Sequence, residues 1–233
     1  MGLDTCAVDG LCATECPVNI NTGDLVKRLR QENHAAFNNN IANWIAHHFA
    51  IVETIVKYAL HAGIFINKIL GRAAMYRLTF LIRKIIPSFP LWVRQLTGPI
   101  AIPAATSSSP DFIYFTCCMN RMMGADIEKD KTIVDSVLSI ADKAGFVVSI
   151  PENINGHCCG QAFSSKGFKD AYKFSANKMV ETLWKWTNEG KIPVVFDITS
   201  CTNSLKTCRS YLNPDNQKTF DQLRILDLSL IHI

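Results

Sequence analysis

The feature that most constrains this chain is Gly-His-Cys-Cys-Gly at residues 156–160, where two cysteines are adjacent in sequence. Adjacent cysteines do not easily form a disulfide with each other, because the bridge strains the peptide between them. They can instead offer two thiolates to one soft metal centre, and the glycine that follows lets the backbone approach closely. We therefore expect a metal site at Cys158 and Cys159.

Two further cysteines complete a set of four, Cys118 upstream and Cys201 downstream. Four thiolates are what a cubane iron–sulfur cluster or a tetrahedral zinc ion requires. Strands expected from apolar runs precede each cysteine position, and the alternation with helices predicts a parallel sheet. Ligands bind at the carboxyl edge of such sheets, so thiols distant in sequence are predicted to converge there. The expected strands are 112–116, 146–150, 193–198 and 223–226, and the expected helices are 127–144 and 167–187.

Two other cysteines lie near this set. Cys117 is adjacent to Cys118 and competes with it for the same role, whereas Cys208 lies seven residues beyond Cys201. Free cysteine is among the most buried residue types, so Cys208 is expected to be an ordinary buried thiol. His157 and Lys166 lie next to the Cys-Cys-Gly loop. They either tune the site electrostatically or are plain loop residues, and we favour the second interpretation.

A second cysteine group opens the chain. Cys6, Cys12 and Cys16-Pro17 fall on the C-x2-C-x2-C-x3-C-P run of bacterial ferredoxins, with Asp9 in the second cysteine position. In such runs three side chains bind one cluster and the cysteine beside the proline binds the sister cluster. The other ligands of that sister cluster would lie upstream of Cys16, so we expect the chain to be truncated at its start. Chance spacing and structural zinc are the weaker interpretations.

Three interpretations of Asp9 remain open. Its carboxylate, or a water molecule, completes the cluster; the position stays empty and leaves a three-iron cluster; or Asp9-Gly10 is an ordinary turn. A hard carboxylate oxygen matches iron–sulfur chemistry less well than a thiolate does.

Composition narrows the class of protein. Nine cysteines are an odd number, and the chain opens with no secretory signal, which favours reduced thiols in a cytoplasmic protein over a disulfide framework. A net charge of +4 gives no reason to expect nucleic acid as a partner. Charged residues make up 19% of the chain, which is low enough to indicate buried surface or a missing partner surface. The chain contains no run of about 18 uncharged apolar residues, so we expect no transmembrane helix.

The stretch between the two cysteine groups is expected to be helical. In the stretch 19–30, Thr22 is expected to be the N-cap of a helix. Apolar residues at helical spacing predict one long amphipathic helix over 41–70. Its histidines, His47, His48 and His61, are expected to be solvated or capping groups rather than metal ligands.

Residues 71–96 form a basic amphipathic stretch that contains a tryptophan. Such a stretch suits either an anionic membrane surface or packing on a neighbouring domain, and we favour the neighbouring domain. Prolines and serines mark 87–110 as a linker.

The expected fold class is α/β. A helical ferredoxin-like N-terminal segment with long amphipathic helices precedes a Rossmann-like parallel-sheet domain. The boundaries are 1–36 for half of a ferredoxin-type domain, 37–110 for the helical segment and linker, and 111–227 for the cysteine-rich α/β domain. The last residues, 228–233, are similar to translated sequencing adapter, so we expect a non-native tail without function.

Five segments resemble the carboxyl-terminal half of bacterial D-lactate dehydrogenases that contain FAD and iron–sulfur clusters. The region from residue 111 also resembles the cysteine-rich CCG domain of glycolate oxidase iron–sulfur subunits and heterodisulfide reductases. The resemblance places the site cysteines at Cys118, Cys158, Cys159 and Cys201 and leaves Cys117 out. This chain departs from the fuller pattern at Ser204, where the motif ends in cysteine, and it lacks a second CCG repeat. The segments are 4–30, 118–124, 151–160, 163–168 and 193–197.

The resemblance implies an electron-transfer role. An upstream flavin domain with FAD would oxidise a D-2-hydroxy acid, and 4Fe-4S clusters, or a 3Fe-4S cluster at the Asp9 site, would pass electrons to a quinone, cytochrome or other carrier. Peripheral contact with the inner membrane is compatible with this role. The alternative function is a structural zinc or thiol-binding interaction module, because zinc accepts the same four thiolates.

Overall fold

The computed structural model describes residues 2–8, 11–14, 16–18, 20–87, 89–93, 95–125 and 131–229. The fold is mixed α/β, mostly helical, with one small parallel sheet. Its N-terminal and central helices are α1 (Gly2–Thr5), α2 (Leu11–Thr14), α3 (Thr22–Glu32), α4 (Ala36–His47), α5 (Phe49–Leu70) and α6 (Ala74–Ile85). The remainder is β1 (Phe112–Phe115), α7 (Cys118–Met123), α8 (Ile133–Lys143), β2 (Val148–Ser149), α9 (Gln161–Lys166), α10 (Lys169–Trp186), β3 (Val194–Phe196), α11 (Thr199–Lys206), a 3-10 turn (Cys208–Tyr211), α12 (Pro214–Phe220) and β4 (Ile225–Asp227).

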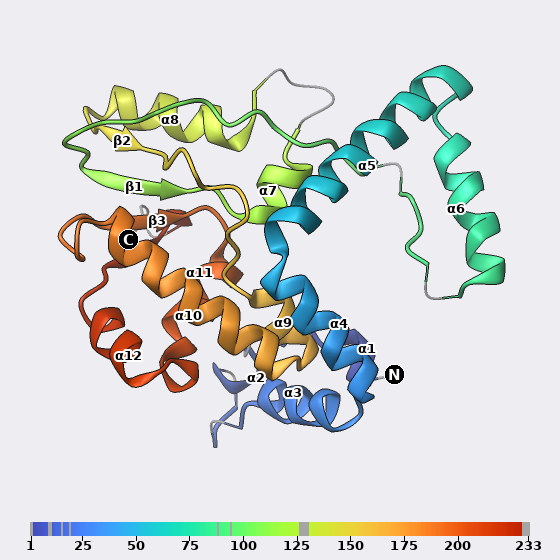
Figure 1. The fold of residues 1–233 in the computed structure, drawn as a ribbon, viewed down its shortest axis with the longest axis horizontal. Coiled ribbons are helices and arrows are strands. Elements are labelled where there is room, and N and C mark those ends of the chain that lie inside the picture. Colours follow the sequence, from blue (N-terminus) through green and yellow to red (C-terminus); the bar gives the residue numbers. More distant parts are fainter. Residues whose placement is uncertain are drawn as a thin grey trace.

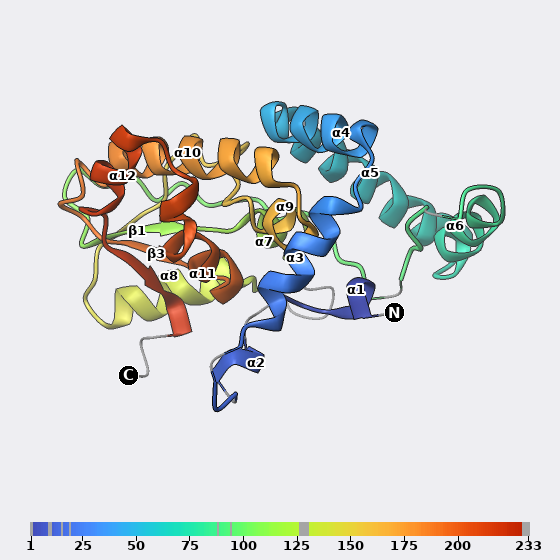
Figure 2. The same ribbon diagram turned by 90° about the horizontal axis from the view of Figure 1, so that it is seen from below.

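The sheet has the strand order β2-β1-β3-β4, and all its strand pairs are parallel. Its two central strands, β1 and β3, are short apolar runs whose side chains are almost wholly buried. Continuous apolar runs are expected where both faces of a parallel sheet are covered. Helix α8 lies on one face and α10 on the other (Figure 2), which confirms the predicted parallel sheet between helices.

The expected helix over 127–144 is α8, which begins at Ile133 because Thr132 and Asp135 form a reciprocal capping box. Residues 126–130 lie outside the described part of the chain. Gly145, at φ 79°, follows the end of this helix in the left-handed region, as expected for the residue that closes it.

The single long helix expected over 41–70 is wrong, because the structure contains two helices that meet at His48. The His48 backbone leaves helical geometry at φ −109° and ψ 28°, its Nδ1 lies 2.9 Å from the Trp44 carbonyl oxygen, and its ring stacks on Trp44. Helix α4 packs along α10, whereas α5 leads away from the sheet (Figure 1). Apolar periodicity continues through such a break, so it did not reveal the change in direction.

The expected N-cap of the first long helix is also wrong. Thr22 is the first helical residue of α3, and the side chain of Asn21 accepts the hydrogen bond from Gly23 N–H at 2.9 Å. Both residue types are good N-caps. The Thr22 hydroxyl instead lies 2.9 Å from the Cys12 thiol.

Candidate metal centre

The ends of three strands position the four candidate cysteines. After β1, Thr116 and Cys117 connect the strand to α7, and Cys118 is the first residue of that helix. After β3, Cys201 lies in the first turn of α11, and the loop that follows β2 carries Cys158 and Cys159. The strand order reverses between β1 and β3, which is where open parallel sheets form a ligand-binding crevice. The structure thus brings together the four cysteines that the sequence places at strand ends.

The thiols form a continuous cluster that includes a fifth member. Cys118 Sγ and Cys158 Sγ are 3.8 Å apart, and the Cys159 thiol interacts with both Cys158 and Cys201. Cys117 is fully buried and interacts with Cys201. The resemblance leaves Cys117 out, but the structure places its thiol within this cluster. Cys208 is buried outside the cluster, where burial raises the pKa of its thiol to about 12.

Gly160 fixes the turn that presents Cys158. Its φ is 81°, in the left-handed region that glycine adopts without steric cost, and its N–H donates to Cys158 Sγ at 3.4 Å. A Cβ at this position would lie 2.9 Å from the Tyr172 ring and 3.0 Å from Ser175 Cβ. The last position of the Cys-Cys-Gly motif therefore requires glycine, because any other side chain would strain the backbone and would collide with Tyr172 and Ser175.

Burial and thiol–thiol contacts keep these cysteines protonated at neutral pH. Desolvation raises the pKa of Cys117 to about 12. Cys158 reaches a pKa of about 12, because the contact with Cys159 and burial outweigh the lowering contact with Cys118. The contact with Cys158, followed by burial, raises the pKa of Cys118, and the contact with Cys117 is the main cause that raises the pKa of Cys201. Binding a metal here must therefore release protons.

A buried ion pair supports the loop that carries Cys158. Arg121 is fully buried and Glu53 is 1% exposed, and the guanidinium donates to both carboxylate oxygens at 2.8 and 2.9 Å. The remaining donors of Arg121 reach the carbonyl oxygens of Thr116 at 2.7 Å and His157 at 2.6 Å. Gly156 N–H donates to Glu53 Oε2 at 2.7 Å. The pair joins α5, α7, the end of β1 and the cysteine loop, and places a cation beside the thiols.

Sequence reasoning assigned no role to this pair. The available signal was Glu53 itself, a lone carboxylate on a strongly apolar helix, because buried carboxylates require a charged partner. Burial raises the pKa of Glu53, but the hydrogen bonds and charge of Arg121 outweigh it and lower that pKa to about 2. The partner of Glu53 is 68 residues away, so the sequence did not identify it.

Asp197 organises the other side of the thiol cluster. Its carboxylate accepts hydrogen bonds from Tyr114 Oη at 3.0 Å, Cys117 N–H at 2.9 Å and Asn120 Nδ2 at 2.9 Å. These bonds hold the end of β3 against the start of α7. Nearby, the buried Thr116 Oγ1 has no hydrogen-bond partner.

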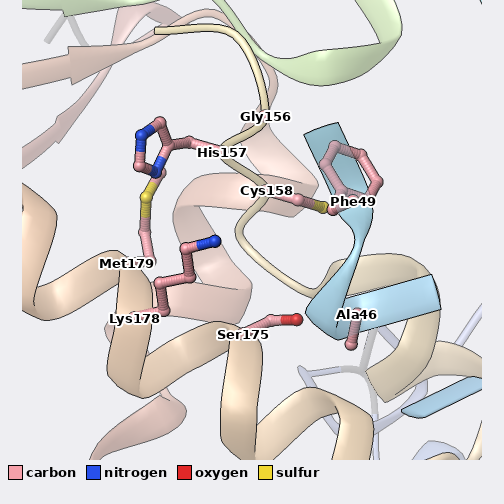
Figure 3. Close-up of a pocket in the computed structure, with 8 residues that line it drawn as sticks. All are labelled: Ala46, Phe49, Gly156, His157, Cys158, Ser175, Lys178 and Met179. Atoms are coloured by element: carbon pink, nitrogen blue, oxygen red, sulfur yellow. The ribbon is translucent and has the colours of Figure 1, made fainter. Parts of the chain in front are cut away.

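A small cavity of about 10 Å³ opens beside Cys158 (Figure 3), with room for about one water molecule. His157 and Lys178 lie on one side of it and Phe49 on the other. Burial, followed by the positive charge of Lys178, lowers the pKa of His157 to about 4, so this imidazole is neutral at physiological pH. A larger cleft of about 420 Å³, lined by Lys57, 100–104, 150–152 and 154–155, has no cysteine in its wall.

The N-terminal cysteines are separate from this cluster. Cys6 and Cys16 are half-buried and Cys12 is exposed, and Asp9 lies outside the described residues. A hydrogen bond from Thr22 is the main cause that lowers the pKa of Cys12. Arg30 ties this region to α9 by donating to the Ser165 carbonyl oxygen and to Cys6 O at 2.9 Å.

No protein-family model, curated protein or solved structure matches this chain. Its function is therefore inferred from its residues and their geometry.

The donor chemistry of the thiol cluster fits a soft metal centre. Among the residues that the structure describes, no three His, Cys, Asp or Glu side chains already have the spacing of ligands around one metal ion. The cluster nevertheless offers five thiols, an N–H donor to sulfur and a buried cation, which are features that stabilise thiolate-bound metal centres.

Proposed function

We propose that this chain is the electron-transfer part of a flavin-dependent D-lactate or D-2-hydroxy acid dehydrogenase. Cys118, Cys158, Cys159 and Cys201 would hold an iron–sulfur cluster, with Cys117 beside it. The observation that carries the proposal is the convergence of these thiols at the carboxyl edge of a parallel sheet, where the backbone N–H of Gly160 donates to Cys158. The family resemblance of the sequence motifs adds the substrate class.

The N-terminal run would hold further iron–sulfur chemistry. Its spacing supports cluster ligation by Cys6 and Cys12, with Asp9 or an open position in the remaining slot, and Cys16 reaching a sister cluster. In this proposal the segment is ferredoxin-like and the sheet domain is Rossmann-like, since the order β2-β1-β3-β4 is that of a doubly wound sheet. FAD would belong to an upstream flavin domain, and a quinone, cytochrome or other carrier would accept the electrons.

A bound cluster supplies one-electron transfer, and the residues of this chain set its conditions. Burial of Cys117, Cys159 and Cys201 keeps water from the site. The Gly160 N–H and the Arg121 guanidinium stabilise negative charge on the sulfurs, which raises the reduction potential of the centre. Glu53 neutralises part of that effect, because its carboxylate pairs with Arg121.

A structural zinc site is the second candidate, and one distance favours it. The separation of 3.8 Å between Cys118 Sγ and Cys158 Sγ matches the edge of a tetrahedron with Zn–S bonds of about 2.3 Å. In that case the chain would be an interaction module without redox turnover.

Metal analysis of the purified full chain separates the two functions. After anaerobic reconstitution with iron and sulfide, we expect bound iron, acid-labile sulfide and an EPR signal that changes on reduction with dithionite. Cys158→Ser should lose the share of iron and signal that belongs to this site. Cys208→Ser removes a buried thiol outside the cluster and should retain both.

Other metal contents would contradict the proposal. Zinc near one per chain, without sulfide or an EPR signal, would establish the structural module instead. Equal iron loss in Cys158→Ser and Cys208→Ser would place the cluster elsewhere. Cys12→Ser, measured in parallel, separates the N-terminal run from the sheet site.

A further inference from the structure

Helices α5 and α6 form a helical hairpin, residues 49–86, that extends away from the sheet domain (Figures 1 and 2). The hairpin has specific internal contacts. Asn67 Oδ1 accepts from Met75 N–H at 2.9 Å across the turn, and Thr79 Oγ1 accepts from Trp92 N–H at 3.0 Å. The Trp92 ring covers Gly63, where a Cβ would lie 2.3 Å from the ring. The hairpin therefore has one defined inner face.

Its outer face is apolar and uncovered. Exposed residues on α5 recur at intervals of four and three, which places them in one stripe along the helix. A second exposed stripe on α6 includes Ile85, which is 84% exposed. Solvent-exposed stripes of this length on a self-packed element indicate an interaction surface. The α5 stripe is Ile51, Ile55, Tyr58, Ala62, Phe65 and Ile69, and the α6 stripe is Leu78, Leu81 and Ile85.

Beyond Glu53, which is buried and paired with Arg121, the charged side chains of the hairpin and of the segment after it are all basic. Residues 54–110 contain no Asp or Glu, although they contain seven Lys and Arg residues. The rest of the chain holds all 20 Asp and Glu residues and the other 17 Lys and Arg residues, so it is net acidic while residues 54–110 are strongly basic. The basic residues are Lys57, Lys68, Arg72, Arg77, Arg83, Lys84 and Arg94.

We propose that the outer face of the hairpin binds the surface of an anionic lipid bilayer. Exposed apolar stripes with cations and no carboxylates have the composition of helices that lie in the membrane interface. Protein interfaces instead commonly pair charges of both signs. Residues 54–110 offer no carboxylate to a basic partner, whereas anionic headgroups complement the cations other than Lys57, which is paired with Glu53.

The contacts of α5 indicate that it lies on the membrane rather than crossing it. Among the described residues, α5 is the only helix whose length and composition would suit a span, and 17% of its most apolar window is buried. However, Glu53 is bound to Arg121, and Lys57 Nζ lies 2.9 Å from Glu53 and 2.8 Å from Asn155. These contacts fix the first turns of α5 to the protein. The free part, 58–70, is about 20 Å long, shorter than the hydrocarbon core of about 30 Å.

Vesicle flotation of the full chain tests the proposal. We expect the protein to float with phosphatidylglycerol/phosphatidylcholine vesicles at low salt and to stay unbound with pure phosphatidylcholine. The double variant Arg77→Gln/Lys84→Gln should lower partitioning by about 30-fold, since each cation near an anionic surface contributes a factor of about five. Lys169→Gln/Lys206→Gln removes two exposed cations from the sheet domain and should leave partitioning unchanged.

An apolar variant completes the test. Ile69→Asp should lower partitioning by about tenfold or more. Ile140→Asp is a matched control, because Ile140 on α8 is 64% exposed and Ile69 is 63% exposed. Equal binding to neutral vesicles, or equal loss in both Asp variants, would overturn the proposal. Absence of flotation together with a dimer in sedimentation velocity that Ile69→Asp dissociates would assign the face to a second copy.

Discussion

At the scale of single residues, Gly160 carries a steric constraint that a similar glycine does not share. Gly160 and Gly145 have nearly equal φ values, 81° and 79°. A Cβ at Gly145 would meet nothing within 4 Å, whereas a Cβ at Gly160 would contact Tyr172 and Ser175. The difference between these two positions therefore isolates the close approach beside Cys158.

We expect Gly145→Ala to lower the free energy of unfolding by about 1 kcal/mol, the cost of left-handed backbone for alanine. Gly160→Ala should cost about 1–3 kcal/mol more, because the added methyl overpacks the site. Urea denaturation of both variants measures the difference. Equal losses would mean that Tyr172 and Ser175 yield without cost.

At the scale of elements, α5 has different surroundings along its length. Its first turns are fixed by the Glu53–Arg121 pair and by Ala50, which lies against Gly156. Its later turns contact α6, the Trp92 ring at Gly63 and the backbone of Gly98 at Ile64. One helix thus joins the cysteine loop to an exposed surface.

Gly63→Ala tests how the hairpin is packed. In an open helix this change adds up to about 1 kcal/mol of stability. Here we expect a loss, because the new methyl requires the Trp92 ring to move. In a Trp92→Leu background the sign should reverse, as the smaller side chain leaves room for the methyl. Thermal unfolding of the four proteins in this double-mutant cycle gives the coupling, and additive effects would show that the contact is absent.

At the scale of the whole molecule, the Glu53–Arg121 pair links the helical segment to the sheet domain and makes stability depend on pH. The pKa of Glu53 is lowered from 4.5 to about 2. A lowered carboxyl pKa contributes stability that is present above pH 4.5 and is lost as pH falls through about 2. The shift corresponds to about 3 kcal/mol.

We expect the free energy of unfolding of the native chain to fall by about that amount across this acid range, in addition to the background from other carboxylates. Glu53→Gln should be less stable at pH 7 by about 3–5 kcal/mol, because Arg121 remains buried without a counter-charge, and should lack this part of the acid dependence. Asp221→Asn, which breaks an exposed pair with Arg209, should keep it. Identical pH profiles for Glu53→Gln and the native chain would contradict the role of the pair.

The sequence by itself determined the strand–helix alternation, the parallel sheet and the convergence of Cys118, Cys158, Cys159 and Cys201. These follow from local apolar patterns and from a topological rule that holds for parallel sheets in general. Only the tertiary structure decided that Cys117 joins the thiols, that Arg121 pairs with Glu53, that α4 and α5 part at His48, and that the outer face of α5 is uncovered. Each of these depends on residues distant in sequence or on the direction of a chain after a break, and local periodicity contains neither.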